Sequence, residues 1–340
     1  MFLVLEGLLL GSVWSKETCP RFRPLPGIEL RSLACKASSQ EIIRRTIWWE
    51  NNKKIEAHNA KHRDSNHTFK MAMNHFGDWV SDGIIVIDKI HKICLLQYML
   101  WISQAGDRLS KMAIISFGTK IGALPQGICW TSAGYVTEVK YQGPCSSCWA
   151  FSVTGSLEGQ LFKKTGKLIS LSEQNLVDCS RGYGSNGCNG GWPSQAYQYI
   201  KDNRGIEATA TYPYIAKHST CNYDGSNKVT SISGFKVLPF GNEAALAKAV
   251  AEIGPIAVVI DASLASFQFY SSGVYYDVEC KSNKYNHAVL VVGYGVQGGQ
   301  NYWNVKNSWG VFWGNNGYIR MAKDRNNHCA IASYPMYPEI

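Results

Sequence analysis

The segment around Cys148 carries the side chains best suited to chemistry in this chain. Apolar residues recur every four positions through the stretch that begins there, at Trp149, Val153, Leu157 and Leu161, which predicts a helix with one buried face. A thiol in the first turn of a helix feels the positive end of the helix dipole, and this favours the thiolate. A thiolate is the nucleophile that acyl transfer requires, so Cys148 is the candidate nucleophile.

Two other interpretations of this cysteine stay open on the residues alone. A cysteine at a helix start is as often a packing residue as a nucleophile. Cys145 and Cys148 also have the Cys-x-x-Cys spacing of a redox or zinc pair. A zinc site needs further cysteine or histidine ligands at suitable spacing, and from residue 123 onward the sequence has no second Cys-x-x-Cys and no His-x-x-x-His. The spacing therefore gives little support for a zinc site, and the family resemblance described below implies no metal and no organic cofactor.

A base for the thiol must be a histidine, and from residue 123 onward there are only His218, His287 and His328. His218 lies in a polar stretch and His328 adjoins a cysteine near the end of the chain. His287 leads directly into an apolar run over residues 288–292. A polar ring at the mouth of a buried strand suits a cleft, so His287 is the candidate base.

Asn307 lies just after the predicted strand over residues 302–305 and is followed by Ser308-Trp309-Gly310. Its amide is suited to orienting the imidazole, with Trp309 shielding that hydrogen bond from water. A buried structural asparagine is an equal alternative for this residue taken in isolation.

Bulk properties limit the class of protein. The chain has 340 residues, 45% hydrophobic and 17% charged, which is typical of a globular protein long enough for two hydrophobic cores. From residue 123 onward 17 basic residues face 14 acidic ones, so most of the net charge of +9 lies earlier. No basic stripe with interleaved aromatics is present there, which argues against nucleic-acid binding.

Eleven cysteines indicate an oxidising compartment, because so many are unusual in a cytosolic enzyme of this size. Residues 1–15 match a secretory signal peptide only weakly, because Glu6 interrupts the apolar run and no basic residue precedes it. The apolar stretch over residues 84–102 contains four ionisable side chains, so no membrane span is expected.

The order of elements predicts an α+β protein built of two packed halves. Residues 1–39 are expected to lack packed structure, and residues 40–78 to be helical. Ser170-x-x-Glu173 predicts a capping box before a helix, and residues 243–252 predict another helix. Strands are predicted at residues 256–260, 288–292, 302–305 and 318–321.

Taken together, Gln142-x5-Cys148-Trp149, a histidine before an apolar strand, and Asn307-Ser-Trp-Gly resemble the papain family of cysteine proteases. The resemblance runs from about residue 123 to the end. Within the family the chain looks most like the cathepsin L group, in particular the cathepsin S type. The resemblance implies a two-domain fold, with a helical left domain, a β-barrel-like right domain and the cleft between them.

The same resemblance implies roles for individual residues. Cys148 attacks the scissile carbonyl, His287 is its imidazolium partner and Asn307 orients His287. The Gln142 side chain and the Cys148 backbone N–H form the oxyanion hole. Gly190 and Gly191 offer backbone hydrogen bonds to an extended peptide. The pocket for the substrate residue two before the cut (P2) is lined by Trp192, Pro193, Val259, Ala288 and Tyr334.

Disulfides are also implied by the resemblance, namely Cys145–Cys188, Cys179–Cys221 and Cys280–Cys329, which leaves Cys148 free. Because cathepsin S-type enzymes have glycine at the Val259 position, we expect a narrower P2 pocket that accepts valine or leucine better than bulky aromatic residues.

Residues 40–78 resemble the family's propeptide, through Gln40-x3-Arg44-x3-Trp48-x2-Asn51-x3-Ile55-x3-Asn59 and Ala72-x-Asn74-x-Phe76-x-Asp78. We therefore expect a propeptide over residues 16–122 and a peptidase domain over residues 123–340. Asn66-His67-Thr68 is a glycosylation sequon.

The implied protein is a monomeric lysosomal or endosomal cysteine endopeptidase, or a secreted one, made as a zymogen. Its partners would be polypeptide substrates, cystatin-like inhibitors and its own propeptide. Ser146, where the family has glycine, leaves two rival hypotheses. One is a catalytically impaired paralogue, and the other is a binding module that keeps the cleft and engages inhibitors.

Overall fold

The computed structural model describes residues 30–63, 68–79 and 124–340, without the side chains of residues 30–40, 42, 62 and 63. The predicted signal peptide, the Asn66 sequon and the apolar stretch over residues 84–102 lie outside the described residues. Among those that are described, no helix is long and apolar enough to cross a membrane. A unit boundary falls between Ile43 and Arg44, within the first helix, and the contacts below concern residues 44–340.

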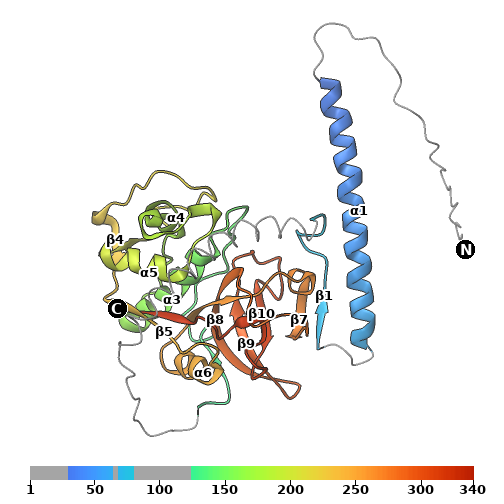
Figure 1. The fold of residues 1–340 in the computed structure, drawn as a ribbon. Helices are drawn as coiled ribbons and strands as arrows, with labels where there is room; N and C mark the ends of the chain where they lie inside the picture. The colour runs from blue at the N-terminus through green and yellow to red at the C-terminus, as the bar shows by residue number, and fades with distance from the viewer. Residues whose placement is uncertain (1–29, 64–67, 80–123) are drawn as a thin grey trace, which may run out of the picture. The chain divides into compact units, whose positions relative to one another are not determined.

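Helices and strands follow in the order expected for an α+β protein (Figure 1). The helices are α1 (Leu30–Arg63), α3 (Cys148–Thr165), α4 (Glu173–Cys179), α5 (Pro193–Asp202), α6 (Glu243–Glu252) and α7 (Ala265–Gln268), with 3₁₀ turns η1 (Ser180–Tyr183), η2 (Gly187–Asn189), η3 (Gly225–Asn227) and η4 (His328–Ala330). The strands are β1 (Phe69–Met71), β2 (Ile128–Cys129), β3 (Ile206–Glu207), β4 (Lys228–Thr230), β5 (Gly234–Val237), β6 (Ile256–Ile260), β7 (Tyr270–Tyr275), β8 (His287–Gln297), β9 (Gln300–Lys306), β10 (Tyr318–Ala322) and β11 (Met336–Glu339).

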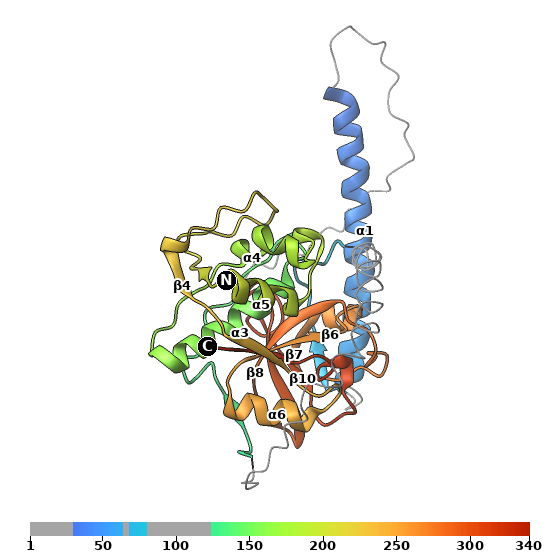
Figure 2. The ribbon, with the colours of Figure 1, turned by 60° about the vertical axis from the view of Figure 1, so that its left-hand side comes forward.

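Most of these strands form one nine-stranded sheet in the described part of the chain. Its path runs β1-β7-β10-β9-β8-β6-β11-β5, and β2 pairs with β8 outside this path. Neighbours are antiparallel except β7 and β10. In both views α3, α4 and α5 gather on one side and strands β7, β8 and β10 on the other (Figure 2).

Two hydrophobic clusters correspond to the two predicted halves. One surrounds the sheet and includes Trp303 and Trp313, which are fully buried. The other is built around α3 and includes Trp149 and Leu157. Each half therefore buries its own apolar surface, which is why both can be stable while polar groups lie where they meet.

Helix α3 follows the predicted apolar stripe closely. Trp149, Val153, Leu157 and Leu161 are all buried. The helix ends at Thr165 and is capped by Gly166, whose φ of 72° is the left-handed conformation common at helix C-termini. The helix over residues 243–252 and the strand over residues 256–260 have the predicted bounds.

Two local predictions were wrong. Ser172, not Ser170, caps α4 by accepting a hydrogen bond from the Asn175 N–H at 2.9 Å, because the helix begins two residues later than a capping box at Ser170 requires. Ser170 instead hydrogen-bonds Thr209. The helix of the propeptide-like region begins at Leu30 and ends at Arg63, so residues 30–39 are helical and residues 68–78 are not.

One face of α1 holds the segment that follows it, and this explains the spacing of its polar residues. Asn59 exchanges two hydrogen bonds with the backbone of Met71, at 2.8 and 2.9 Å. Buried Asn51 donates to the Gly77 carbonyl at 3.0 Å. Arg44 pairs with Asp78. Residues 44, 51 and 59 lie seven or eight apart, so they share one helix face.

The segment held by α1 continues onto the peptidase-like region as an added strand. β1 pairs antiparallel with β7, and the Ala72 N–H donates to the Phe269 carbonyl at 2.9 Å. The Asn74 side chain donates to the Gln268 carbonyl at 2.8 Å. These backbone contacts bring residues 75–79 to the mouth of the site described next.

Candidate active site

Cys148, His287 and Gln142 line one pocket of about 250 Å³. Cys148 is the first residue of α3 and is buried, and His287 is the first residue of β8. Backbone N–H groups of Ala288, Trp149 and Cys148 itself reach the Cys148 sulfur. The sulfur therefore lies beside Ala288, the residue that follows His287, although Cys148 and Ala288 are 140 positions apart in the sequence.

The hydrogen bonds of Asn307 determine which nitrogen of His287 is basic. The Asn307 Oδ1 accepts the Ser308 N–H at 2.8 Å, so this atom is the amide oxygen. It lies 2.7 Å from the His287 Nε2. An oxygen can only accept, so Nε2 carries the proton and Nδ1 is left as the basic nitrogen.

Trp309 covers this pair. Its ring lies 4.7 Å from the His287 ring, at an interplanar angle of 30°. His287 and Asn307 are both buried. The low local dielectric strengthens their hydrogen bond and keeps water from competing for it.

Gln142 is held in one orientation by three contacts. Its Nε2 donates to the Cys145 carbonyl at 2.9 Å, and its Oε1 accepts from the Ser308 hydroxyl at 2.7 Å. Its backbone N–H donates to the Ser308 carbonyl at 2.8 Å. An amide nitrogen has two hydrogens, so the second N–H of Nε2 can bind an oxygen in the pocket.

Burial raises the pKa of the Cys148 thiol to about 11, although N–H groups of Ala288, Trp149 and Cys148 lower it. Part of this burial comes from the propeptide-like region, because His75, Phe76 and Trp79 line the same pocket. The Phe76 ring lies 5.0 Å from the Trp309 ring, and the His75 ring lies 5.8 Å from that of Tyr141. Burial also lowers the pKa of His75.

Four of the residues predicted for the P2 pocket belong to the cluster around α3 or pack against it, namely Trp192, Val259, Ala288 and Tyr334. Val259 on β6 lies directly opposite Ala288 on β8. Trp192 precedes α5, and its ring lies 5.4 Å from that of Tyr334. Pro193 is buried at the first position of α5.

Gly190 and Gly191 border this cluster. A Cβ at Gly191 would come within 2.6 Å of the Trp149 indole, so only glycine lets the backbone approach that ring. Gly190, Gly191 and the five P2-pocket residues do not line the 250 Å³ pocket around Cys148 and His287.

Ser146 also lines that pocket, half-buried, with its N–H donating to the Cys188 carbonyl at 2.9 Å. Its φ is not positive. The position therefore does not need a glycine conformation, so Ser146 strains no backbone there, and the rival hypotheses keep only the crowding of the substrate backbone by its side chain.

Three further residues line this pocket and were not predicted from the sequence, namely Tyr141, Gly143 and Asn286. Asn286 precedes His287, and its Oδ1 accepts the Ala262 N–H at 2.7 Å. Tyr141 is exposed beside Gln142 and forms a β-bridge with Trp309. Their positions next to named catalytic candidates were the available signal.

A buried group of charged side chains lies beneath the site. Lys140 pairs with Glu158 at 3.0 Å and with Glu173 at 2.6 Å, and Lys306 donates to the Thr137 carbonyl at 2.8 Å. Lys140, Glu158, Glu173 and Lys306 line a cavity of about 20 Å³ together with Asn307. We call these four residues the buried charge cluster.

Burial and neighbouring charge oppose each other in this cluster. Burial raises the pKa of Glu158, but the positive charges of Lys140 and Lys306 lower it by more than burial raises it. The pKa of Glu158 is therefore shifted downward. Burial raises the pKa of Glu173, and this effect prevails. Burial lowers the pKa of Lys306 to about 8. Sequence patterns did not predict the cluster, because its members come from distant segments.

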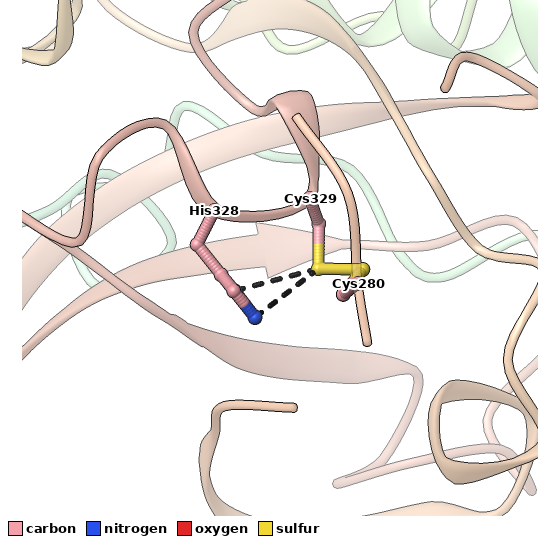
Figure 3. Close-up of side chains that lie close together, drawn as sticks. All are labelled: Cys280, His328 and Cys329. Carbon is pink, nitrogen blue, oxygen red and sulfur yellow. Dashed lines mark hydrogen bonds between the residues drawn. A yellow bond between two sulfur atoms is a disulfide. The ribbon is translucent and has the colours of Figure 1, made fainter. Parts of the chain in front are cut away.

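Three disulfides join the pairs that the family resemblance implied: Cys145–Cys188, Cys179–Cys221 and Cys280–Cys329. Cys148 is a free thiol, and so is exposed Cys129. Among the described residues, Cys280, His328 and Cys329 lie close enough together for a metal ion (Figure 3). The two sulfurs are bonded to each other, so neither is a thiolate ligand in this state.

Comparisons with known proteins agree with this arrangement. The family described as papain family cysteine protease matches residues 124–339, and the cathepsin propeptide inhibitor domain (I29) matches residues 36–84. The chain is similar to human cathepsin L2, with 46% identity over 89% of this chain and 88% of that protein. It is similar to bovine cathepsin S, with 48% identity over 90% of this chain and 88% of that protein.

A solved structure with a similar fold is the digestive procathepsin L 3 of the Tenebrio molitor larval midgut. The TM-score is 0.77 at 42% identity, covering 88% of this chain and 92% of that one. The predicted papain-like α+β fold with a propeptide is therefore confirmed.

Proposed function

Because this chain belongs to the papain family of cysteine proteases, we propose that it is a zymogen whose peptidase domain cuts extended polypeptides through an acyl-enzyme on Cys148. The observation that carries the proposal is the convergence on one pocket of a buried thiol at a helix N-terminus, an oriented imidazole and a fixed amide. The thiol is Cys148, the imidazole is that of His287, and the amide is that of Gln142.

The first step is proton transfer from the Cys148 Sγ to the His287 Nδ1, which forms a thiolate and an imidazolium. The helix dipole and three N–H groups stabilise the thiolate. Asn307 accepts from Nε2–H in both charge states of the ring, so it keeps Nδ1 directed at the sulfur.

The thiolate then attacks the carbonyl carbon of the scissile peptide bond. The negative charge that develops on oxygen is stabilised by the second N–H of the Gln142 Nε2 and by the Cys148 backbone N–H. The C–N bond breaks as the His287 Nδ1–H protonates the leaving amine, which leaves a thioester on Cys148. Water, deprotonated by Nδ1, hydrolyses the thioester, and the sulfur departs as thiolate.

Substrate specificity arises mainly at P2 in this proposal. Gly190 and Gly191 bind the extended peptide through the backbone, and Trp192, Pro193, Val259, Ala288 and Tyr334 surround the P2 side chain. Val259 and Ala288 face each other across β6 and β8, so they limit the width of the pocket. Valine or leucine at P2 is expected to be cleaved better than phenylalanine, and equal turnover of paired fluorogenic substrates would contradict this.

The propeptide, proposed to span residues 16–122, keeps the zymogen inactive. Phe76 and Trp79 cover the mouth of the pocket, and the buried thiol stays protonated at neutral and acidic pH because its pKa is raised to about 11. Removal of residues 75–79 would expose the pocket and free the thiol to ionise.

The proposed compartment is the lysosome or endosome, with secretion as the alternative, because three disulfides form in oxidising compartments. The proposed partners are polypeptide substrates and cystatin-like inhibitors, and the proposed working form is a monomer.

A thiol-reactive active-site probe tests the proposal when it is followed by turnover of a valine-P2 or leucine-P2 substrate. The processed protein is expected to be labelled at Cys148 and to hydrolyse the substrate, and the Cys148→Ser variant to do neither. Labelling without turnover would favour the binding module, and absence of labelling in a folded protein would favour the impaired paralogue.

A further inference from the structure

The Tyr334 ring, a proposed wall of the P2 pocket, is surrounded by three other aromatic rings. The rings of Trp192, Phe240 and Tyr285 lie 5.4, 5.4 and 5.2 Å from it, at interplanar angles of 77°, 74° and 78°. All three pairs are edge-to-face contacts, the geometry that aromatic rings prefer. Trp192 was predicted as part of the pocket, whereas Phe240 and Tyr285 have no role in the proposed function.

Phe240 is tied to the segment that carries Tyr334 by backbone hydrogen bonds on both sides. The Leu238 N–H donates to the Pro335 carbonyl at 2.9 Å, and the Gly241 N–H donates to the Ala332 carbonyl at 2.7 Å. These bonds extend the pairing of β5 with β11 past its last pair, Val237 with Met336. Phe240 and Tyr334 are therefore held next to each other by the backbone.

The turn that carries Phe240 is also fixed by hydrogen bonds. The Asn242 N–H donates to the Pro239 carbonyl at 3.3 Å, which closes a four-residue turn with Phe240 at its second position. Gly241 follows with a φ of 70°, the positive value that a type II turn requires and that favours glycine. Asn242 then caps α6 by accepting the Ala245 N–H at 2.9 Å. The turn cannot shift without breaking a helix cap.

Phe240 remains 61% exposed, so its ring gains little from burial. A single exposed aromatic is common on protein surfaces and needs no explanation by itself. What distinguishes Phe240 is that its ring lies edge-to-face against the ring of Tyr334, a proposed wall of the P2 pocket.

Resting on the proposed function, we propose that Phe240, together with Tyr285, is a positioning residue that keeps the Tyr334 ring from swinging away from the P2 pocket. The pocket then stays small because Val259 narrows one side and the clamped Tyr334 ring cannot retreat on the other. A phenylalanine at P2 fits only if Tyr334 moves, and that movement breaks the contact with Phe240. The substrate class follows: extended peptides with valine or leucine at P2.

The test compares processed wild type, Phe240→Ala and Phe240→Tyr on two fluorogenic peptides that differ only by valine or phenylalanine at P2. Removing one edge-to-face pair is expected to raise the phenylalanine-to-valine ratio of kcat/KM by about 2- to 10-fold. The gain should appear mostly as a lower KM for the phenylalanine peptide, since the reacting groups are unchanged. Phe240→Tyr keeps the ring and should keep the wild-type ratio.

Phe312→Ala is the matched control, because Phe312 is 88% exposed on a turn after Trp309 and no ring contact to it is found among the described residues. The phenylalanine-to-valine ratio of kcat/KM for Phe312→Ala should equal that of wild type. A Phe240→Ala ratio within a factor of about 1.5 of the Phe312→Ala ratio would overturn the proposal while leaving the protease function intact.

Failure of the proposed function would look different, because wild type would then turn over neither peptide. In that case the same two peptides, fluorescently labelled, are titrated into Cys148→Ser proteins from which the propeptide has been removed, with and without Phe240→Ala, and binding is followed by anisotropy. A rise in the relative affinity for the phenylalanine peptide supports the clamp without any catalysis. Equal relative affinities in the two proteins, or no binding of either peptide, overturn it.

Discussion

Replacing Glu158 by glutamine should remove much of the stability of the peptidase domain, although it deletes no atoms from the core. Glu158 accepts hydrogen bonds from the Thr137 hydroxyl, the Lys140 ammonium and the Leu171 N–H, at 2.7, 3.0 and 2.9 Å. Glutamine has the same shape and can keep part of this pattern. The substitution therefore tests mainly the loss of a buried charge.

The expected magnitude follows from the burial of the pair. Glu158 is 1% exposed and the Lys140 side chain 17%. Removing one partner of a buried ion pair costs about 3–5 kcal/mol. Here the Glu158 carboxylate offsets the burial of both Lys140 and Lys306, and without it Lys140 keeps only its pair with Glu173. For a domain of this size, ~1 kcal/mol corresponds to a shift in Tm of about 2–4 °C, so the melting temperature should fall by about 6–20 °C.

The control is Glu339→Gln, which breaks the pair with Lys236 at 2.7 Å where both side chains are more than 40% exposed. Such exposed pairs contribute about 0–1 kcal/mol. Both substitutions are made in a Cys148→Ser background to prevent self-digestion, and the free energy of unfolding is measured by urea titration with the disulfides oxidised. A Glu158→Gln loss within about 1 kcal/mol of the control would refute the reasoning.

The pH dependence of the free energy of unfolding gives a second test of the pair between Glu158 and Lys140. The pKa of Glu158 is lowered in the folded protein, so its contribution is complete above the ordinary glutamate pKa and is lost only as pH falls through the lower folded value. The difference between wild type and Glu158→Gln should therefore persist in mildly acidic buffer. If the two proteins became equally stable already near neutral pH, the pKa of Glu158 would not be lowered in the folded protein.

Three further predictions concern the site and its surroundings. In the zymogen, alkylation of Cys148, followed on its peptide by mass spectrometry, should speed up about tenfold per pH unit until about pH 11, since burial raises the thiol pKa to about 11. A plateau in the acidic range would contradict a protonated thiol. Asn307→Ala should lower kcat by on the order of 10²-fold, because the imidazole loses its orientation. An unchanged kcat would exclude this role. The pKa of Lys306 is lowered to about 8, so between about pH 8 and 10.5 the unfolded state binds more protons and this residue makes stability rise with pH. Urea titrations of Lys306→Met should lack this rise relative to wild type, and equal slopes would refute it.

Local signals in the sequence were sufficient where neighbouring residues decide the structure. The helix over residues 243–252 has an asparagine cap before it and a Gly-Pro after it, and its bounds were predicted correctly. The cap of α4 was misplaced by two residues because Ser170-x-x-Glu173 matches the capping-box pattern, whereas Ser172 is followed three residues later by Asn175. Tertiary contacts decided between them, since the Ser172 hydroxyl also donates to the Tyr212 carbonyl.

By itself, the sequence determined which chemical groups are present and, through their order, the family to which they belong. Only the tertiary structure decided which groups meet. The Asn307 oxygen selects the basic nitrogen of His287 across 20 residues, Glu158 meets Lys306 beneath them, and Phe240 meets Tyr334 across 94 positions. No local pattern encodes such contacts, because they depend on how β5, β8, β9 and β11 pair in one sheet. The physical reason is that burial, charge and ring packing act between neighbours in space, whereas sequence periodicity reports only neighbours along the chain.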